Sequence, residues 1–412
     1  MLGLVAVALA LPAAGYSGGS GGQSRHELEV FSWWTGGGEA AGLNRIVAIW
    51  KKEHPNVKFI NATVAGGAGT NAKAVLAQRL AANDPPDSFQ GHAGAELQDY
   101  IKAGDLEPVD FIYRQEGFGR GMPKQLISQI TYRGKLYSVP VNIHRANVLW
   151  YNPSVLREAG IRSAPKTWGQ FVAALERAKD AGVIPLAVGE QWTQKHLFET
   201  VLLATLGPAR YAALWRGSGG WSSAGVKTAI NRYAELLQYT NRDAASLTWQ
   251  DASKLVVDGK AAFNIMGDWA NGYYTELKKR ANRDYGWAPV PGTGGVYQWL
   301  SDSFTLPKGA PHRANAIEWL KLVGSKRAQD AFNPVKGSIP ARQDANPRLY
   351  NTYLRWALKE WKRTKLAGSL THGVVASNAW NAAIDTALGQ FLQTRNVSSF
   401  QAGLVSAAKK HA

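Results

Sequence analysis

Two segments of the chain place tryptophan beside an acidic residue. Trp33 and Trp34 are followed by three glycines and Glu39, and Asp268 precedes Trp269. A sugar ring offers two apolar C–H faces and a girdle of hydroxyls, so its site needs flat aromatic surfaces next to hydrogen-bonding side chains. Adjacent strand residues point to opposite faces, so core packing accounts for at most one indole of the Trp33–Trp34 pair. The combination predicts a site for a small polyhydroxylated ligand.

The same acidic residues leave a hydrolytic site open. A glycosidase holds two carboxylates about 5–10 Å apart across the sugar, and Glu39, Asp268 and Asp302 each lie in an aromatic-rich neighbourhood. The sequence does not give their separation, and carboxylates that only accept hydroxyl bonds look the same at this level. A carbohydrate-active hydrolase with paired carboxylates is therefore the alternative hypothesis.

A glycine pattern also has to be weighed as a dinucleotide-binding motif. Gly67, Gly69 and Ala72 give G-x-G-x-x-A between a strand-like and a helix-like segment, and Asp87 follows. In a dinucleotide-binding fold the acidic residue stands at the end of the second strand of a βαβ unit. Asp87 instead follows a Pro-Pro pair, which disfavours this interpretation.

Composition removes several other classes of function. The chain has 412 residues, 16 tryptophans, no cysteine and a formal charge of +17. Without cysteine there are no disulfides, thiolate metal sites or cysteine nucleophiles. The sequence lacks an H-E-x-x-H motif and an Asp-rich calcium loop, so neither a metal nor a cofactor is predicted. Lysine and arginine are scattered rather than clustered, which disfavours a nucleic-acid partner.

The first 26 residues are predicted to be a leader and a tether. Residues 2–14 form an apolar run of the length of a signal-peptide core, too short to span a bilayer. A Gly/Ser-rich stretch over 15–22 follows and predicts a flexible spacer. Tyr16 stands where a lipoprotein would carry its lipidated cysteine. We expect export to the periplasm or cell envelope, with the lipid anchor left open.

The rest of the chain alternates strand-like and helix-like segments, which is typical of an α/β fold. Strands are expected over 28–34 and 57–64, a helix over 71–82, and extended pieces over 87–90, 135–141 and 146–152. The remainder is mostly helical, with helices expected over 168–181, 198–206, 226–240, 314–324 and 350–366. No repeat of 20–50 residues occurs, so a solenoid or propeller is not predicted.

Six short segments in collinear order carry a resemblance to a known family. They are 84–87 (DPPD), 134–140 (GKLYSVP), 149–152 (LWYN), 165–168 (PKTW), 258–262 (DGKAA) and 337–342 (GSIPAR). Together they resemble the extracellular solute-binding proteins of bacterial ABC importers, in the sugar-binding family. The Trp-Trp-Thr-Gly-Gly-Gly-Glu start is most similar to the glucose- and galactose-binding members.

This resemblance implies a type II periplasmic-binding-protein fold, with two α/β lobes that close on a ligand in the cleft between them. The expected N-terminal lobe is 27–142 plus 286–333. The expected C-terminal lobe is 145–284 plus 337–410. The chain is expected to cross between the lobes near 142–145, at Tyr285 and near 333–336.

The resemblance also implies a set of ligand contacts. Trp269 is expected to stack on a sugar face, Asp302 to accept hydroxyl bonds, and Lys336 and His372 to donate them. Asp268 is a weaker candidate. The full set of expected sugar-binding residues is Trp33, Trp34, Glu39, Gln90, His92, Trp269, Asp302, Lys336 and His372.

The sequence thus predicts a binding protein without catalytic residues. We expect it to capture a monosaccharide, glucose or galactose, and to deliver it unchanged to the permease subunits of an ABC transporter. We expect it to act as a monomer. Saturable sugar binding without product formation would separate this prediction from the hydrolase hypothesis.

Overall fold

The computed structural model describes residues 26–217 and 219–412. The predicted leader, its Gly/Ser spacer and Tyr16 therefore lie outside the described residues. Among the residues that are described, no helix combines the length and the apolar character needed to cross a bilayer.

The strands of the described part of the chain are short, and most belong to three sheets. Their bounds are β1 Glu27–Ser32, β2 Lys58–Thr63, β3 Ser88–His92, β4 Thr131–Tyr132, β5 Lys135–Leu136, β6 Ser138–Pro140, β7 Asn142–Arg145, β8 Val148–Tyr151, β9 Ile184–Ala187, β10 Ala261–Ile265, β11 Gly286–Pro289, β12 Val296–Leu300, β13 Asp302–Thr305, β14 Ile339–Pro340 and β15 Lys365–Gly368.

Helices make up most of the remainder. The α-helices are α1 Gly37–Glu53, α2 Thr70–Ala81, α3 Ala95–Ala103, α4 Asp110–Glu116, α5 Phe118–Gly121, α6 Lys124–Gln129, α7 Pro153–Glu158, α8 Trp168–Asp180, α9 Gln191–Leu214, α10 Ala224–Leu236, α11 Trp249–Val257, α12 Trp269–Glu276, α13 Arg313–Gly324, α14 Lys326–Lys336, α15 Thr352–Arg363, α16 Asn378–Thr394 and α17 Val397–His411. Short 3₁₀ turns lie at Gly67–Gly69, Leu237–Tyr239, Ala244–Ser246 and Pro347–Leu349.

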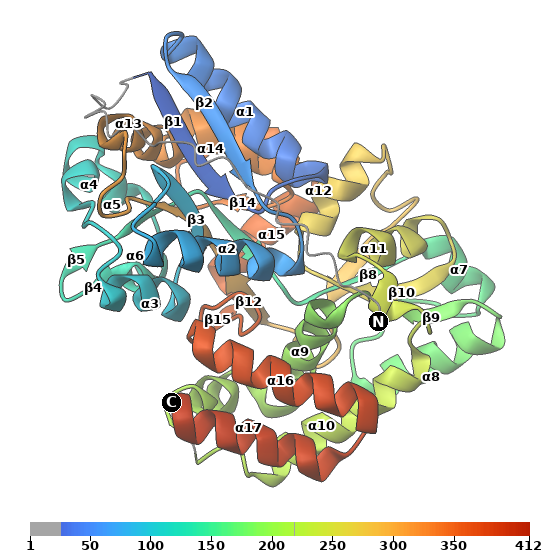
Figure 1. The fold of residues 1–412 in the computed structure, drawn as a ribbon. Helices are drawn as coiled ribbons and strands as arrows, with labels where there is room; N and C mark the ends of the chain where they lie inside the picture. Colours follow the sequence, from blue (N-terminus) through green and yellow to red (C-terminus); the bar gives the residue numbers. More distant parts are fainter. Residues whose placement is uncertain (1–25, 218) are drawn as a thin grey trace, which may run out of the picture.

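The first sheet has the strand order β2-β1-β3-β13-β6. β1 pairs in parallel with β2 and β3, whereas β13 comes from residues 302–305 and runs antiparallel to β3. Helices α1 and α13 pack on this sheet, and α14 packs on α1. These elements lie together at the top of Figure 1. The first sheet is therefore built from two distant parts of the chain, as the resemblance implies.

The second sheet has the order β11-β8-β10-β9 and is covered by α7, α8 and α11. The pairing of β11 with β8 is antiparallel, from Gly286 opposite Tyr151 to Pro289 opposite Val148. The chain is thus still in the second sheet at Pro289, after the crossing expected at Tyr285. The lobe boundaries given above stay a prediction, but the strand pairing places residues 286–289 with the second sheet.

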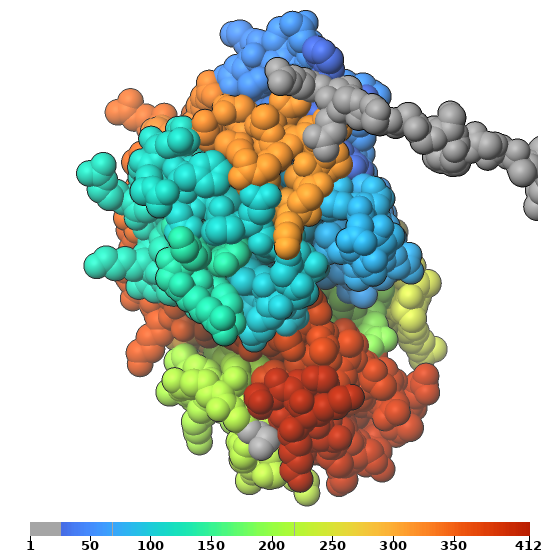
Figure 2. All heavy atoms as spheres, turned by 60° about the vertical axis from the view of Figure 1, so that its left-hand side comes forward, coloured from blue at the N-terminus to red at the C-terminus, as the bar shows by residue number. Residues whose placement is uncertain are grey.

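A third sheet, with the order β14-β7-β12-β15, lies between the other two. Its strand β7 covers the residues 142–145 where a crossing was expected, and β12 and β14 pair with β7 on its two sides. Residues 333–336, where a crossing was expected, instead end helix α14, and Gly337 terminates that helix at φ 88°. In Figure 2 blue, teal and orange segments mix in the upper mass, whereas yellow-green and red segments mix in the lower one.

The lower mass contains a layer of α9, α10, α16 and α17, in which α16 packs on α17 and α10 on α9. The predicted helix over 198–206 lies within α9, which is buried from Trp192 to Leu203. It stops at Gly207, where φ is 72° and Pro208 follows. Proline cannot donate to the preceding turn and glycine accepts a positive φ, so this pair breaks the helix.

Candidate functional site

One cavity of about 250 Å³ lies among the starts of α1, α11 and α12 and the ends of β3 and α14. Eight of the nine predicted contact residues border it, and Gln90 does not. The volume is just below the range of ~300–1,000 Å³ of sites for drug-sized ligands. The bordering residues are Trp33, Trp34, Thr35, Glu39, Ala65, Gly66, Gly67, Gly69, His92, His144, Glu190, Trp192, Thr248, Trp249, Gln250, Trp269, Leu300, Asp302, Lys336 and His372.

Trp33 follows β1 and packs against the glycine-rich turn after β2. A Cβ added to Gly69 would lie 2.8 Å from the Trp33 ring, and Gly69 has φ +91°. The ring also lies 5.0 Å from His92 and 5.5 Å from the Lys73 ammonium. The glycines considered above as a nucleotide motif therefore allow an indole to approach the backbone closely.

Trp34, in contrast, belongs mainly to the core. Its side chain is almost fully buried, with ring centroids 5.7 Å from Phe304 and 5.0 Å from Phe332. The Lys336 ammonium lies 5.6 Å from its ring. Trp34 thus supports the cavity wall and the cation beside it.

Lys336 and Glu39 form an ion pair at the cavity edge. Lys336 Nζ donates to Glu39 Oε1 at 2.8 Å, and the lysine side chain is 2% exposed. Glu39 occupies the first turn of α1, where a carboxylate is favoured by the helix dipole. A buried ammonium needs such a partner, because an unpaired charge away from water is costly.

Asp302, the first residue of β13, is contacted by donors from the strands β3 and β7. Its Oδ1 accepts from Gln90 Nε2 at 2.9 Å and its Oδ2 from Asn142 Nδ2 at 2.7 Å. His144 Nε2 lies 3.4 Å from Oδ2. Burial opposes ionisation, but the His144 bond and the charges of Lys336 and His144 lower the pKa of Asp302 far below its ordinary value. Asp302 is therefore a carboxylate at neutral pH and can only accept.

Gln90 supports the site from behind Asp302. Its amide nitrogen donates to Asp302, and its oxygen accepts from the backbone N–H of Trp33 at 3.3 Å. Both ends of the side chain are thus used within the protein. The structure places Gln90 beside the cavity without bordering it, where its side chain links the Trp33 backbone to Asp302.

His144 is a cavity residue that was not among the expected contacts. Its Nδ1 hydrogen-bonds to Asp268, and its Nε2 faces Asp302. Burial and the charge of Lys336 oppose protonation, yet Asp268 and Asp302 outweigh them and raise the pKa of His144. Asp268 itself is fully buried, does not border the cavity, and also accepts the Arg145 N–H at 2.9 Å. Asp268 therefore orients His144.

Trp269 forms an aromatic wall together with two further tryptophans. Its centroid lies 5.0 Å from His372 and 6.3 Å from Trp192, and Trp249 borders the same cavity. Trp192 and Trp249 were not predicted. Trp192 follows Glu190 by two residues, and its Nε1 donates to that carboxylate at 2.9 Å. An indole near an acid was thus the available sequence signal here too.

His92 completes the polar wall and depends on a buried carboxylate. Glu96 Oε2 lies 2.9 Å from His92 Nδ1 and 2.7 Å from Lys73 Nζ. Burial raises the pKa of Glu96, but Lys73 and His92 together lower it to about 2. A charged Glu96 therefore keeps the His92 ring in place, with its Nε2 facing Asp302 at 3.7 Å.

His372 enters the cavity wall from the loop between β15 and α16. Its Nδ1 lies 2.9 Å from Ser369 Oγ. Burial and the positive charges of His92, His196 and Lys73 lower the pKa of His372 well below its ordinary value. His372 is therefore neutral at neutral pH.

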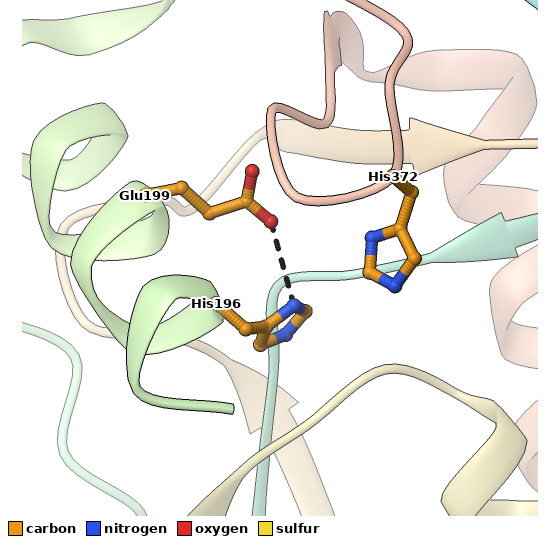
Figure 3. A group of neighbouring side chains, drawn as sticks. All are labelled: His196, Glu199 and His372. Atoms are coloured by element: carbon orange, nitrogen blue, oxygen red, sulfur yellow. Dashed lines mark ion pairs between the residues drawn. The ribbon is translucent and has the colours of Figure 1, made fainter. Parts of the chain in front are cut away.

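One group of side chains has metal-ligating types, namely His196, Glu199 and His372, with ligand atoms within 4.8 Å of one another (Figure 3). Glu199 already accepts the backbone N–H groups of Leu370 and Thr371, at 2.6 and 3.0 Å. His196 Nε2 lies 3.0 Å from the Ala146 carbonyl oxygen. These contacts use most of the donors and acceptors of the group for hydrogen bonds within the protein.

The arrangement can hold a neutral polar ligand but lacks the acid that hydrolysis needs. A glycosidase requires a protonated carboxyl group beside the sugar, with a raised pKa. Of the three cavity carboxylates, Asp302 has a strongly lowered pKa, Glu39 is paired with Lys336, and Glu190 accepts from Trp192 Nε1. Burial raises the pKa of Asp268, but Asp268 does not border the cavity.

A two-lobed α/β fold with a cavity lined by aromatic and polar side chains is typical of ligand-binding proteins. Residues 30–330 match the family described as bacterial extracellular solute-binding protein. The chain belongs to this family, whose members are binding proteins of ABC importers and not catalysts.

Relatives and solved structures agree with this assignment. The chain is 36% identical to an uncharacterised ABC transporter extracellular-binding protein of Pyrococcus horikoshii, over 94% of this chain and 88% of that protein. It is 31% identical to the xylose/arabinose-binding protein XacG of Haloferax volcanii, over 95% and 87% of the two chains. The structure of the bacterial galactopyranose receptor AcbH matches with a TM-score of 0.81 and 20% identity, over 94% and 98% of the chains.

Proposed function

We propose that this protein captures one monosaccharide, glucose or galactose, outside the cytoplasmic membrane and delivers it unchanged to the permease of an ABC importer. The observation that carries the proposal is the cavity of about 250 Å³, in which indoles face carboxylate, ammonium and imidazole groups. Indoles bury the C–H faces of a sugar, and the polar groups match its hydroxyls.

The proposed contacts divide between direct and supporting residues. Trp33 and Trp269 provide ring faces, Asp302 accepts hydroxyl bonds, and Lys336 donates them. His92, His144, Trp192 and Trp249 extend the predicted set, while Gln90 and Trp34 support it. We propose that a single chain is sufficient, because the described residues enclose the cavity without a second copy.

A pentose is the second candidate ligand. The Haloferax relative, which this chain matches over almost its whole length, is named for xylose and arabinose. A pentose lacks the C6 hydroxymethyl group of a hexose, so it would leave part of a hexose-sized site unfilled. Comparing the affinity for glucose with that for xylose, and the affinity for galactose with that for arabinose, therefore measures how much the C6 hydroxymethyl group contributes to binding.

Calorimetric titration of the purified protein with these four sugars and with maltose tests the proposal. We expect one site, tightest for a hexose, with no heat from maltose because a second ring exceeds the cavity. Sugar analysis after overnight incubation should show no product. Tighter binding of maltose, or release of a product, would overturn the proposal. Trp269→Ala locates the site, and Trp361→Ala, which changes a half-buried indole outside the cavity, is its matched control.

A further inference from the structure

A chain of three side chains runs from the interior of α9 to the cavity wall. Glu199 is fully buried on α9, and Ser369 begins the loop that carries His372. Ser369 Oγ lies 2.9 Å from Glu199 Oε1 and 2.9 Å from His372 Nδ1. Figure 3 shows Glu199 and His372 facing one another below this loop. The serine hydroxyl therefore connects the carboxylate to the imidazole.

Counting donors and acceptors fixes the direction of these bonds. A hydroxyl has one hydrogen and two lone pairs, and a carboxylate only accepts. The hydroxyl hydrogen of Ser369 must therefore go to Glu199. Its lone pairs then accept the backbone N–H of His372, at 3.3 Å, and a hydrogen on the ring nitrogen Nδ1. This accounting places a proton on Nδ1.

The other ring nitrogen is then left with a lone pair. His372 is neutral at neutral pH, since burial and neighbouring cations lower its pKa, and a neutral imidazole carries one N–H. Within residues 26–217 and 219–412 no hydrogen bond to Nε2 of His372 is found, and the ring borders the cavity. Nε2 is thus available as an acceptor for a ligand.

We propose that Glu199, acting through Ser369, fixes His372 in the Nδ1–H form, so that Nε2 selects a sugar hydroxyl that donates. Glu199 is thus a positioning residue and His372 a specificity-determining one. This inference rests on the proposed function of the cavity. It reverses the expectation from the sequence that His372 donates to the sugar.

The substitution Glu199→Gln tests the direction of the bonds. The glutamine oxygen can still accept the N–H groups of Leu370 and Thr371, which keeps the loop in place. Its NH₂ group, however, donates to Ser369, so the serine hydroxyl is released to donate to Nδ1. The proton of His372 then moves to Nε2. The same substitution thus retains the loop and inverts the tautomer.

Long-range ¹H–¹⁵N spectra of protein labelled at histidine nitrogen report which ring nitrogen carries the proton. His372→Ala identifies the signals. We expect Nδ1–H in the wild type without sugar, Nε2–H in Glu199→Gln, and a mixture in Ser369→Ala, which removes the relay. A proton on Nε2 in the wild type, or identical spectra of the wild type and Glu199→Gln, would overturn the inference. Ser369→Ala decides the question if Glu199→Gln fails to fold.

A binding experiment follows the same logic. Replacing one sugar hydroxyl by fluorine removes a hydrogen-bond donor. Of the singly fluorinated analogues of the tightest sugar, the one that lacks the hydroxyl bound by Nε2 should therefore bind the wild type about tenfold or more weakly. That loss should shrink in Glu199→Gln and disappear in His372→Ala. Equal losses in all three forms would overturn the inference. Absence of any sugar binding would defeat the proposed function instead, while the spectra of unliganded protein still decide the tautomer.

Metal analysis covers the competing explanation for this cluster. A metal ion held by His196, Glu199 and His372 through Nδ1 would need an unprotonated Nδ1, since metals bind the imidazole lone pair. We expect less than a tenth of an equivalent of zinc, copper or nickel after purification without chelator. A stoichiometric metal ion together with an unprotonated Nδ1 would overturn the inference.

Discussion

Lys336 at the end of α14 donates a 2.8 Å hydrogen bond to Glu39 in the first turn of α1, 297 residues earlier in the chain. The same ammonium lies 5.6 Å from the Trp34 ring. Burial raises the pKa of Asp302, but the His144 bond and the charge of Lys336 lower it. α1 and α14 pack directly on each other. One cation thus pairs with Glu39 and favours the charged form of Asp302.

Lys336→Met should therefore weaken sugar binding by tenfold or more and lower the free energy of unfolding by about 3–5 kcal/mol, as expected when one partner of a buried pair is removed. Calorimetric titration and urea unfolding measure the two effects. Lys326→Met is the control, because Lys326 begins the same helix with its side chain 46% exposed. A substitution at such an exposed residue should change the free energy of unfolding by no more than about 0.5 kcal/mol. Equal effects of the two substitutions would contradict this role of Lys336.

Gly69→Ala should displace Trp33 and reduce sugar affinity. The added methyl group would lie 2.8 Å from the indole, and φ is +91°. Gly104→Ala is a matched control, since Gly104 has φ +84° but nothing within 4 Å of the added atom. Both variants should lose stability of about 1–2 kcal/mol from the left-handed backbone. Only Gly69→Ala should lose affinity, as measured by tryptophan fluorescence. A similar loss of sugar affinity in Gly104→Ala would contradict the explanation that the added methyl group displaces Trp33.

Trp269→Ala should cost about 1–3 kcal/mol of sugar binding through the lost ring face. Trp34→Ala should act differently, because that ring packs on Phe304 and Phe332. Removing a buried tryptophan side chain costs about 3–5 kcal/mol of stability, so its main effect should appear in thermal unfolding. If Trp269→Ala leaves affinity unchanged while the far-UV spectrum is native, the aromatic wall lies elsewhere.

The sequence predicted the fold because hydrophobic periodicity and turn residues act locally. Gly207 and Pro208 end the predicted helix over 198–206, and six collinear segments indicated the family. The crossing expected at Tyr285 stays a prediction, but the pairing of β11 with β8 keeps residues 286–289 in the second sheet, and no local signal encodes that pairing. Eight expected contacts border the cavity. Gln90 stays a predicted contact, and the sequence does not reveal that both ends of its amide also hydrogen-bond within the protein.

The cavity residues that were not predicted show a second limit of prediction from sequence. His144 lies in a strand that was expected only to connect the lobes, and its role depends on two carboxylates more than 120 residues away. Trp192 and Trp249 begin helices whose starts meet only in the folded protein. Residue types near one another in sequence can be weighed from sequence, but the convergence of distant helices and strands on one cavity requires the fold.

The buried carboxylate behind His92 predicts how stability depends on pH. Lys73 and His92 lower the pKa of Glu96 from 4.5 to about 2, against the opposing effect of burial. The unfolded chain therefore binds this proton more readily than the folded one. The contribution to stability is complete above pH 4.5 and is lost as pH falls toward 2. Its size at neutral pH is on the order of 3 kcal/mol.

Glu96→Gln should remove this contribution. Urea unfolding of the wild type and the variant at several pH values from 7 down to 2.5 measures the difference between their free energies of unfolding. That difference should be largest above pH 4.5 and shrink as the solution is acidified, because protonated glutamate and glutamine are both neutral. Glu116→Gln, at an exposed position of α4, should change stability little at any pH. A difference for Glu96→Gln that is constant across the range would mean that lost packing, rather than the ion pairs with Lys73 and His92, accounts for its effect.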